Sequence, residues 1–225
     1  MDFYVNEDSH VDVVNDNLKE YGLSVIEGYL EDVSGIKEEV DRILSETPED
    51  DYSFGKAARI GSFVGHEHSN PWIFKFFSQA WMMRVFMDYM SARPTFNELF
   101  ITHEYKGDVE LARNAYLHFD RIHTFKFMLY LTDVDEQSGP FSVIPGTHLD
   151  GKFLRERTWE GTKEYEELKN RPLLDYPELG YKQEDVIPIT GKAGTVIIFD
   201  SDLFHMGGIV PQDKERMLIR SHYRI

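Results

Sequence analysis

The sequence predicts a mainly β fold with flanking helices, organised as a double-stranded β-helix, that is, a cupin-like jelly-roll barrel. Short β-forming runs separated by Gly, Pro and Asp turns fill the second half of the chain, a pattern typical of sandwiches and barrels. The many aromatic residues, 16 Phe and 12 Tyr, favour a sheet-rich core. The 225 residues suit a single domain, with a helical part over about 1–95 and a jelly-roll core over about 96–225.

The first half of the chain carries helical patterns with one short strand. Apolar residues at helical spacing predict helices over 11–21, 35–44 and 72–89. Gly22 ends the first helix, a strand follows over 23–26, and Ser34 is placed to cap the second helix. The third helix is apolar almost all round, as expected for a helix under a sheet. Frequent Pro, Asp, Gly and Ser predict a loop over 47–70.

The second half of the chain reads as a series of short strands. They are predicted over 98–105, 115–119, 124–131, 141–144, 186–189, 195–199 and 217–223. Turn residues such as Gly139-Pro140 and Pro145-Gly146 separate them. A polar, partly helical stretch over 152–182 interrupts the series. Strands of this length and spacing predict two facing sheets.

Composition excludes several classes of function. The formal charge of −16 argues against nucleic acid as a partner, because phosphate binding requires clustered Lys and Arg. No apolar stretch approaches the roughly 20 residues that span a bilayer, and the N-terminal residues lack the pattern of a signal peptide. We therefore expect a cytoplasmic protein without a membrane partner. Because cysteine is absent, any metal site must use His, Asp and Glu.

Three pairs of histidine and aspartate two positions apart are candidate metal ligands. They are His10 with Asp12, His118 with Asp120, and His148 with Asp150. The first pair precedes a helix, where an acid is favoured as a cap or in the first turn. The third pair lies in a turn whose geometry Pro and Gly set. The second pair lies in a β context, where residues i and i+2 point to the same side. We therefore expect His118 and Asp120 to reach one ion.

A third ligand is expected from a distant strand. His205 follows the predicted strand 195–199 and a polar turn, and Gly207 beyond it allows close approach of backbone or substrate. Two imidazoles and one carboxylate on one face of a metal form the facial triad of non-heme Fe(II) oxygenases. The alternative for His205 is a buried histidine bonded to backbone. Asp200 and Asp202 are further candidate oxygen ligands, although both suit a turn.

Five motifs occur in a fixed order along the chain. They are His118-Phe119-Asp120, the run 127–135, the turn 139–148, the segment 194–207 that contains His205, and Arg216. Together they resemble the phytanoyl-CoA dioxygenase family of Fe(II)/2-oxoglutarate-dependent oxygenases. The opening at 21–26 is similar as well, so the resemblance spans nearly the whole chain. It implies that His148 belongs to a structural turn.

The resemblance implies a role for four residues. His118, Asp120 and His205 would bind Fe(II). Arg216, eleven positions after His205, would form a salt bridge with the distal carboxylate of 2-oxoglutarate. A guanidinium suits this task on independent grounds, because its fork matches a carboxylate bidentately.

Further residues are candidates for binding the co-substrate or the substrate. Arg220 and Arg224 share a strand face with Arg216, so they are its rivals or contacts for an anionic substrate. Tyr105 lies where relatives place a polar contact to the co-substrate. Lys126 interrupts an apolar strand, so it either faces outward into solvent or faces inward with a function. Similar strands in relatives favour the inward, co-substrate-binding alternative.

The sequence also departs from the family pattern. Gly207 stands where relatives often have a Ser that holds the co-substrate, and Asn114 stands near the place where a Gln is common. These departures concern the co-substrate and leave the metal ligands unaffected. The polar segment 152–182, together with His66 and His68, is the expected lid over the site.

The expected activity is a dioxygenase that hydroxylates a small molecule, with Fe(II), 2-oxoglutarate and O2 as cofactor and co-substrates and succinate and CO2 as products. Halogenation is disfavoured, because related halogenases lack the carboxylate that Asp120 supplies. The alternative is a cupin-type metal-binding protein, acting as a sensor, isomerase or structural module, that does not turn over 2-oxoglutarate. A plain cupin has no need of an inward arginine at the position of Arg216, so this residue separates the two hypotheses.

Overall fold

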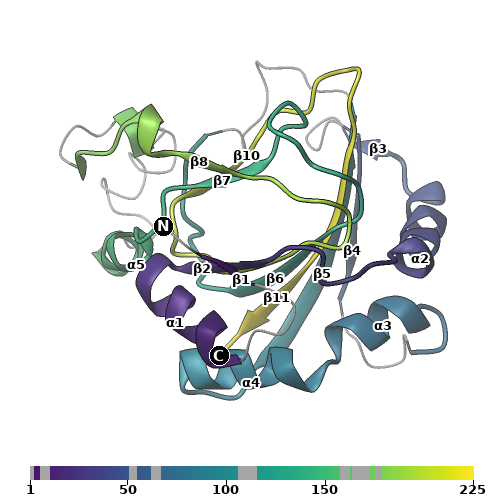
Figure 1. Cartoon of the computed structure of the whole chain (residues 1–225), viewed down its shortest axis with the longest axis horizontal. Coiled ribbons are helices and arrows are strands. Elements are labelled where there is room, and N and C mark those ends of the chain that lie inside the picture. Colours follow the sequence, from purple (N-terminus) through teal and green to yellow (C-terminus); the bar gives the residue numbers. More distant parts are fainter. Residues whose placement is uncertain are drawn as a thin grey trace.

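The computed structural model describes residues 3–5, 11–50, 55–61, 67–105, 116–157, 163, 173–175 and 179–225. Two β-sheets face each other, and helices cover the outer face of the larger sheet (Figure 1). Among the described helices, none has the length and apolar character needed to cross a membrane.

The larger sheet contains the strands that carry most of the core. In spatial order these are β1 (Tyr4–Val5), β2 (Leu23–Ile26), β9 (Val196–Asp200), β6 (Phe125–Tyr130), β11 (Arg216–Arg224), β5 (Thr95–Glu104), β4 (Gly55–Ile60) and β3 (Glu49–Asp50). The smaller sheet has the order β10 (His205–Gly207), β7 (Phe141–Val143) and β8 (Ile187–Ile189). The predicted double-sheet jelly roll is confirmed, with two separate sheets in place of one closed barrel.

The helices are α1 (Val11–Tyr21), α2 (Ser34–Ser45), α3 (Pro71–Phe77), α4 (Ala80–Met90) and α5 (His148–Arg157), with short 3-10 turns at Leu173–Asp175 and Gln183–Asp185. Apolar side chains of α1 to α4 form one cluster with the outer face of the larger sheet. A second cluster joins the inner faces of the two sheets. Both faces of the larger sheet are therefore covered, which explains the continuous apolar runs in its central strands.

Strand β6 illustrates how the sequence alternates between the two faces. Phe125, Phe127 and Leu129 pack outward against the helices. Met128 and Tyr130 pack inward against the smaller sheet. The period of two places Lys126 on the inner face as well, where its side chain is buried. Of the two alternatives for Lys126, the structure therefore has the inward one.

The strand register arranges inner-face residues in rows across the larger sheet. The rows are Glu98–His222–Lys126–Phe199, then Arg59–Phe100–Arg220–Met128, then Thr102–Leu218–Tyr130, then Glu104–Arg216. Successive rows are two residues apart along each strand, or about 7 Å. Charged residues at these positions thus face the interior in a defined order.

Several predicted elements differ in the structure. The helix predicted over 72–89 is two helices, because Gln79 takes an extended conformation at the start of α4. The side-chain oxygen of Gln79 accepts hydrogen bonds from Tyr29 and from Trp81 Nε1, the latter at 2.9 Å, which holds the break in place. The loop predicted over 47–70 contains β3 and β4. Their sequences have little β propensity, and they form because β4 pairs with the exposed edge of β5.

Two smaller expectations are also corrected. Ser34 lies inside α2 and does not cap it; Asp32 Oδ1 accepts the Ser34 backbone N–H at 2.8 Å. The described part of the strand predicted over 115–119 forms only an isolated bridge between His118 and His205. His10, His66, Asn114 and most of the expected lid over 152–182 lie outside the described residues.

Candidate metal centre

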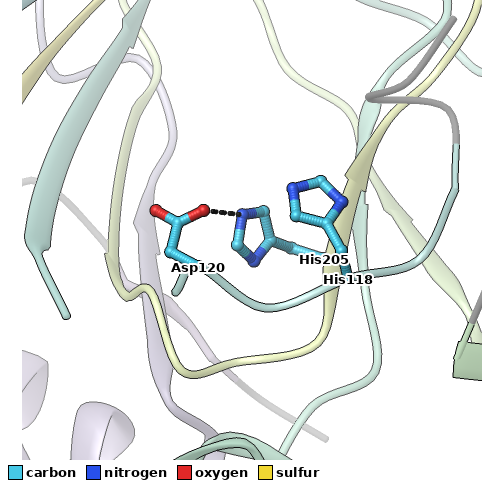
Figure 2. A group of neighbouring side chains, drawn as sticks. All are labelled: His118, Asp120 and His205. Atoms are coloured by element: carbon cyan, nitrogen blue, oxygen red, sulfur yellow. Dashed lines mark ion pairs between the residues drawn. The ribbon is translucent and has the colours of Figure 1, made fainter. Parts of the chain in front are cut away.

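The three predicted metal ligands converge although they are far apart in sequence. His118, Asp120 and His205 each offer one ligand atom, and these atoms lie within 4.8 Å of one another (Figure 2). Asp120 Oδ1 is 3.6 Å from His205 Nε2, and the two imidazole ring centroids are 4.5 Å apart. Two nitrogen donors and one oxygen donor at this separation fit a facial triad around one divalent ion.

Backbone hydrogen bonds bring the two ligand-bearing segments together. The His118 N–H donates to the His205 carbonyl at 2.9 Å, and the His205 N–H donates to the His118 carbonyl at 2.8 Å. The Asp120 N–H donates to the Ser201 carbonyl at 2.9 Å. The segment before β6 is therefore fixed against the turn between β9 and β10, so both histidines enter the site from one bridged pair.

Each imidazole is oriented by a backbone carbonyl. His118 Nδ1 lies 2.7 Å from the Tyr116 oxygen, and His205 Nδ1 lies 2.6 Å from the Leu203 oxygen. A carbonyl only accepts, so each Nδ1 carries the proton and each Nε2 keeps its lone pair for a metal. Burial and the neighbouring His205 lower the pKa of His118 to about 4. His118 is therefore neutral near pH 7, as a metal ligand must be.

The carboxylate ligand is held by a lysine. Lys126 Nζ bonds Asp120 Oδ2, while Oδ1 faces His205. Burial opposes the charge of Asp120, but the Lys126 ammonium holds its pKa well below the usual value. Asp120 is thus an anion with one oxygen occupied by Lys126 and the other available for an ion.

Arg216 lies on the inner face of β11 and is buried. Its Nε donates to Glu104 Oε2 at 2.8 Å, and its Nη2 bonds the same oxygen. Its Nη1 is buried and has no hydrogen-bond partner in the described part of the chain. An inward guanidinium with one unused donor fits a carboxylate-bearing co-substrate.

Tyr105 lies apart from this group. It directly follows β5 and lies an even number of residues from Leu99 and Ile101, which pack on the helix-covered face of the sheet. Its hydroxyl donates to Glu49 of β3 at 3.1 Å. The structure therefore does not bring Tyr105 together with Arg216, and its contact with the co-substrate stays a prediction. Arg224 lies at the far end of β11.

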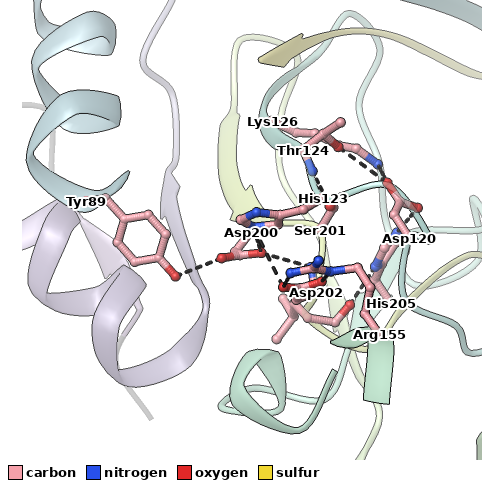
Figure 3. A network of polar contacts seen from close by, with 11 residues as sticks. Tyr89, Asp120, His123, Thr124, Lys126, Arg155, Asp200, Ser201, Asp202 and His205 are labelled. Atoms are coloured by element: carbon pink, nitrogen blue, oxygen red, sulfur yellow. Dashed lines mark hydrogen bonds and ion pairs between the residues drawn. The ribbon is translucent and has the colours of Figure 1, made fainter. Parts of the chain in front are cut away.

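A second group of His and Asp side chains lies beside the first. His123, Asp200 and Asp202 also offer ligand atoms within 4.8 Å of one another. Their charges are already matched (Figure 3), because Arg155 binds Asp202 at 2.6 and 2.8 Å and His123 lies 2.9 Å from Asp200. Asp200 and Asp202 therefore serve the turn, the alternative expected from the sequence.

This polar network connects to the candidate metal centre through the turn after β9. Asp200 also accepts from the Tyr89 hydroxyl of α4 at 3.0 Å, so the network joins α4, α5 and the turn after β9. Ser201 in that turn accepts the Asp120 and Thr124 backbone N–H groups. Sequence reasoning missed Tyr89, Arg155 and Glu104, because each pairs with a residue more than 40 positions away.

Comparison with solved structures identifies relatives in fold. The carbocyclase SnoK from nogalamycin biosynthesis, described as a non-heme alpha ketoglutarate dependent enzyme, is 17% identical with a TM-score of 0.67 over 97% of this chain and 85% of its own. HygX from Streptomyces hygroscopicus, solved with nickel and 2-oxoglutarate bound, is 17% identical with a TM-score of 0.62 over 92% and 83%. The epimerase SnoN, solved with Fe3+, alpha ketoglutarate and nogalamycin RO, is 12% identical with a TM-score of 0.66 over 95% and 82%.

Sequence comparison gives the family. A search among curated proteins finds no match. The family model described as phytanoyl-CoA dioxygenase (PhyH) matches residues 18–217, which is most of the chain. The chain therefore belongs to the phytanoyl-CoA dioxygenase family of Fe(II)- and 2-oxoglutarate-dependent enzymes, as the sequence motifs predict.

Proposed function

We propose that this chain is an Fe(II)- and 2-oxoglutarate-dependent dioxygenase that hydroxylates a small molecule. The observation that supports this function most strongly is the convergence of His118, Asp120 and His205 at ligand distance of one another. Family membership supports the same class of enzyme. Bound Fe(II) with 2-oxoglutarate and O2 would supply the oxidising power, with succinate and CO2 as products.

The chain's own residues hold, orient and shield the reacting groups. The two histidines present Nε2 lone pairs, and Asp120 presents one oxygen while Lys126 occupies the other. Phe141 and Phe199 lie with ring centroids 5.7 and 5.4 Å from that of His205, and they exclude water from this side of the site. Three ligands leave other positions of the metal for the co-substrate and O2.

Arg216 is the proposed partner of the distal carboxylate of 2-oxoglutarate. Its unused Nη1 offers a charge-assisted hydrogen bond, and Glu104 fixes the guanidinium plane from the other side. Arg216 lies in the fourth row of the inner face, while Lys126 of the first row reaches the metal ligands.

Hydroxylation is the proposed outcome because Asp120 is present, whereas exchange of the carboxylate for a halide would require its loss. The fold relatives include a carbocyclase and an epimerase. The substrate contacts of this chain would therefore decide between hydroxylation and such outcomes.

A second candidate is a metal-binding protein that does not turn over 2-oxoglutarate. The observation that favours it is the ion pair between Arg216 and Glu104, which already provides the arginine with a carboxylate. The two candidates agree on the metal and differ on the co-substrate. Binding of 2-oxoglutarate therefore separates them.

The test is anaerobic addition of Fe(II) and 2-oxoglutarate to wild type and to Arg216→Ala. Formation of the chelate is monitored through its weak visible charge-transfer band. We expect the band in wild type and at least about tenfold weaker 2-oxoglutarate binding in the variant, from loss of a charge-assisted pair. Succinate release with candidate substrates follows. Absence of the band in wild type with Fe(II) bound would favour the metal-binding alternative.

A further inference from the structure

Arg220 is a cation of the inner face to which no carboxylate of the described residues is bonded. It lies in the second row, and its guanidinium carbon is 4.6 Å from the centroid of the Phe100 ring. Its Nε is buried and has no hydrogen-bond partner among the described residues. The residue as a whole is only partly buried.

Three other inner-face cations have carboxylate partners in the described part of the chain. Arg216 is paired with Glu104, and Lys126 is paired with Asp120. Arg59, in the same row as Arg220, lies 3.5 Å from Glu98. Asp120 and Glu104 act on Arg220 only through their charge, with no bond to it. Arg220 therefore differs from these three cations, because no described carboxylate is bonded to it.

Charges of both signs lie near Arg220, from Asp120 and Glu104 on one hand and from Arg216 and Arg59 on the other. His222, one row nearer the metal ligands, has a pKa lowered to about 2 by burial and by the positive charges of Lys126 and Arg220. Its Nε2 is buried and has no hydrogen-bond partner within the described ranges, and its Nδ1 lies 3.5 Å from Glu98 Oε1. A neutral imidazole therefore stands between two cations. A partly buried guanidinium in this setting is costly unless an anion joins it.

The row that contains Arg220 has an exposed end at Arg59 and a buried end at Met128. Arg59 and Arg220 lie on either side of Phe100, and the Arg59 guanidinium carbon is 5.1 Å from the same ring. The Arg59 side chain is 68% exposed, whereas that of Arg216 is 4% exposed. A ligand arriving from solvent thus meets the Arg59–Phe100–Arg220 row before it meets Arg216.

We propose that Arg220 binds an anionic group of the primary substrate, a carboxylate, sulfonate or phosphate, with the adjoining apolar part of the substrate against Phe100. This inference rests on the proposed function, because it requires a co-substrate at Arg216 and a substrate near the metal. The second row lies between the metal-ligand row and the Arg216 row. An anion held there would place neighbouring carbon atoms near the metal centre.

The test uses isobutyrate as an anionic probe and isobutyramide as its neutral match. Both are titrated by saturation-transfer NMR into protein loaded with Zn(II) and saturating 2-oxoglutarate, so that the metal and Arg216 are already engaged. The variants are Arg220→Gln, Arg220→Lys and the matched control Arg224→Gln, which removes the same charge from the same strand. Thermal unfolding confirms that each variant is folded.

We expect wild type to bind isobutyrate in preference to isobutyramide, and Arg220→Gln to weaken isobutyrate binding by about tenfold or more. Arg220→Lys should retain part of the affinity, because it keeps the charge and loses the fork. Arg224→Gln should change the affinity for isobutyrate by less than about twofold. The affinity for 2-oxoglutarate should be nearly unchanged in all three variants.

Two results would overturn the inference while leaving the proposed function intact. The first is equal binding of the two probes by wild type. The second is a loss of 2-oxoglutarate affinity in Arg220→Gln with unchanged isobutyrate binding, which would make Arg220 a co-substrate contact. Failure of wild type to bind 2-oxoglutarate at all would contradict the proposed function, and the inference with it.

Discussion

Lys126 bonds one oxygen of Asp120 and leaves the other oxygen 3.6 Å from His205 Nε2. Oδ2 of the carboxylate is therefore bonded within the protein, and Oδ1 is the oxygen available to a metal ion. Because Lys126 is buried on the inner face, its charge depends on the partly exposed Asp120, and the Lys126 ammonium in turn holds the pKa of Asp120 down. This arrangement limits Asp120 to a single metal bond.

Replacing Lys126 with a neutral side chain should change how Asp120 binds the metal. In Lys126→Met the second oxygen is released, and we expect it to join the metal and occupy a position needed by 2-oxoglutarate. Substitution of a residue that bonds a metal ligand alters metal affinity or activity by about 10- to 100-fold. We therefore expect at least about tenfold weaker 2-oxoglutarate binding to the Fe(II) form.

The measurement is a titration of the charge-transfer band, supported by the visible spectrum of the Co(II) form, which reports coordination number. Lys126→Arg is the control, because it keeps a cation beside Asp120. Identical Co(II) spectra and 2-oxoglutarate affinities in wild type and Lys126→Met would show that Lys126 does not set the coordination of Asp120.

Glu104 should act as the positioning residue for Arg216. In Glu104→Gln the buried guanidinium loses its counter-charge, which costs about 3 kcal/mol of unfolding free energy. Added 2-oxoglutarate supplies a carboxylate to the same guanidinium, so it should stabilise the variant more than wild type. The check is thermal unfolding of the Zn(II) form with and without 2-oxoglutarate.

Glu98→Gln provides the control for this comparison. Its ion pair is with Arg59, which is mostly exposed, so loss of that pair should lower the unfolding free energy far less. An equal thermal shift from 2-oxoglutarate in wild type and Glu104→Gln would mean that Glu104 and the co-substrate do not share Arg216.

His123 should make stability depend on pH near neutrality. Burial opposes its charge, but the hydrogen bond and charge of Asp200 raise the pKa of His123 above its usual value of 6.5. The folded protein then holds this proton more tightly than the unfolded chain. The stabilisation is fully present below about pH 6.5 and is lost as pH rises through the raised pKa.

We therefore expect His123→Gln to reduce the unfolding free energy by about 1–2 kcal/mol near pH 6, and by less at higher pH. Urea unfolding of the metal-free protein between pH 5.5 and 8.5 measures this difference. His68→Gln, at an exposed position, is the control. A difference that grows with pH would have the wrong sign for a protonated His123.

Helix α5 should contribute to the metal centre through a close backbone contact. A Cβ added at Gly151 would lie 1.8 Å from the Asp202 carbonyl oxygen, so this helix position requires glycine. Gly151→Ala should push α5 from the turn after β9 and loosen the bond between Arg155 and Asp202. Overpacking of this kind costs about 1–3 kcal/mol.

Thermal unfolding and Co(II) affinity measure the effect, with the exposed neighbour Lys152→Ala as control. We expect lower stability in Gly151→Ala together with weaker Co(II) binding, because the turn also holds the Asp120 backbone. Lower stability with unchanged Co(II) affinity would show that α5 does not support the metal ligands.

The grouping of His118, Asp120 and His205 and the inward position of Arg216 were predictable because their signals are local. His118 and Asp120 share one side of an extended segment, and Arg216 follows His205 at a fixed spacing. Similar strands in relatives favoured the inward position of Lys126, but the bond of Lys126 to Asp120 was not predicted. Pairs such as Glu104 with Arg216 depend on strand register, which no local pattern of charges encodes.

The same reasoning explains the errors in the fold. Strand β4 has the sequence Gly-Lys-Ala-Ala-Arg-Ile, which lacks strand-forming residues over most of its length, and only the edge of β5 makes it a strand. The break before α4 depends on hydrogen bonds that Gln79 forms with Tyr29, which lies 50 positions away. Tertiary contacts override local propensity in both cases.

The central claim is that His118, Asp120 and His205 hold one Fe(II) ion. Equilibrium dialysis against Fe(II) under argon tests it directly, with wild type, the three single alanine variants and His68→Ala as a surface control. We predict equimolar Fe(II) in wild type and in the control, and at least about hundredfold weaker binding in each of the three variants. Wild-type affinity in any one of those three variants would contradict the claim.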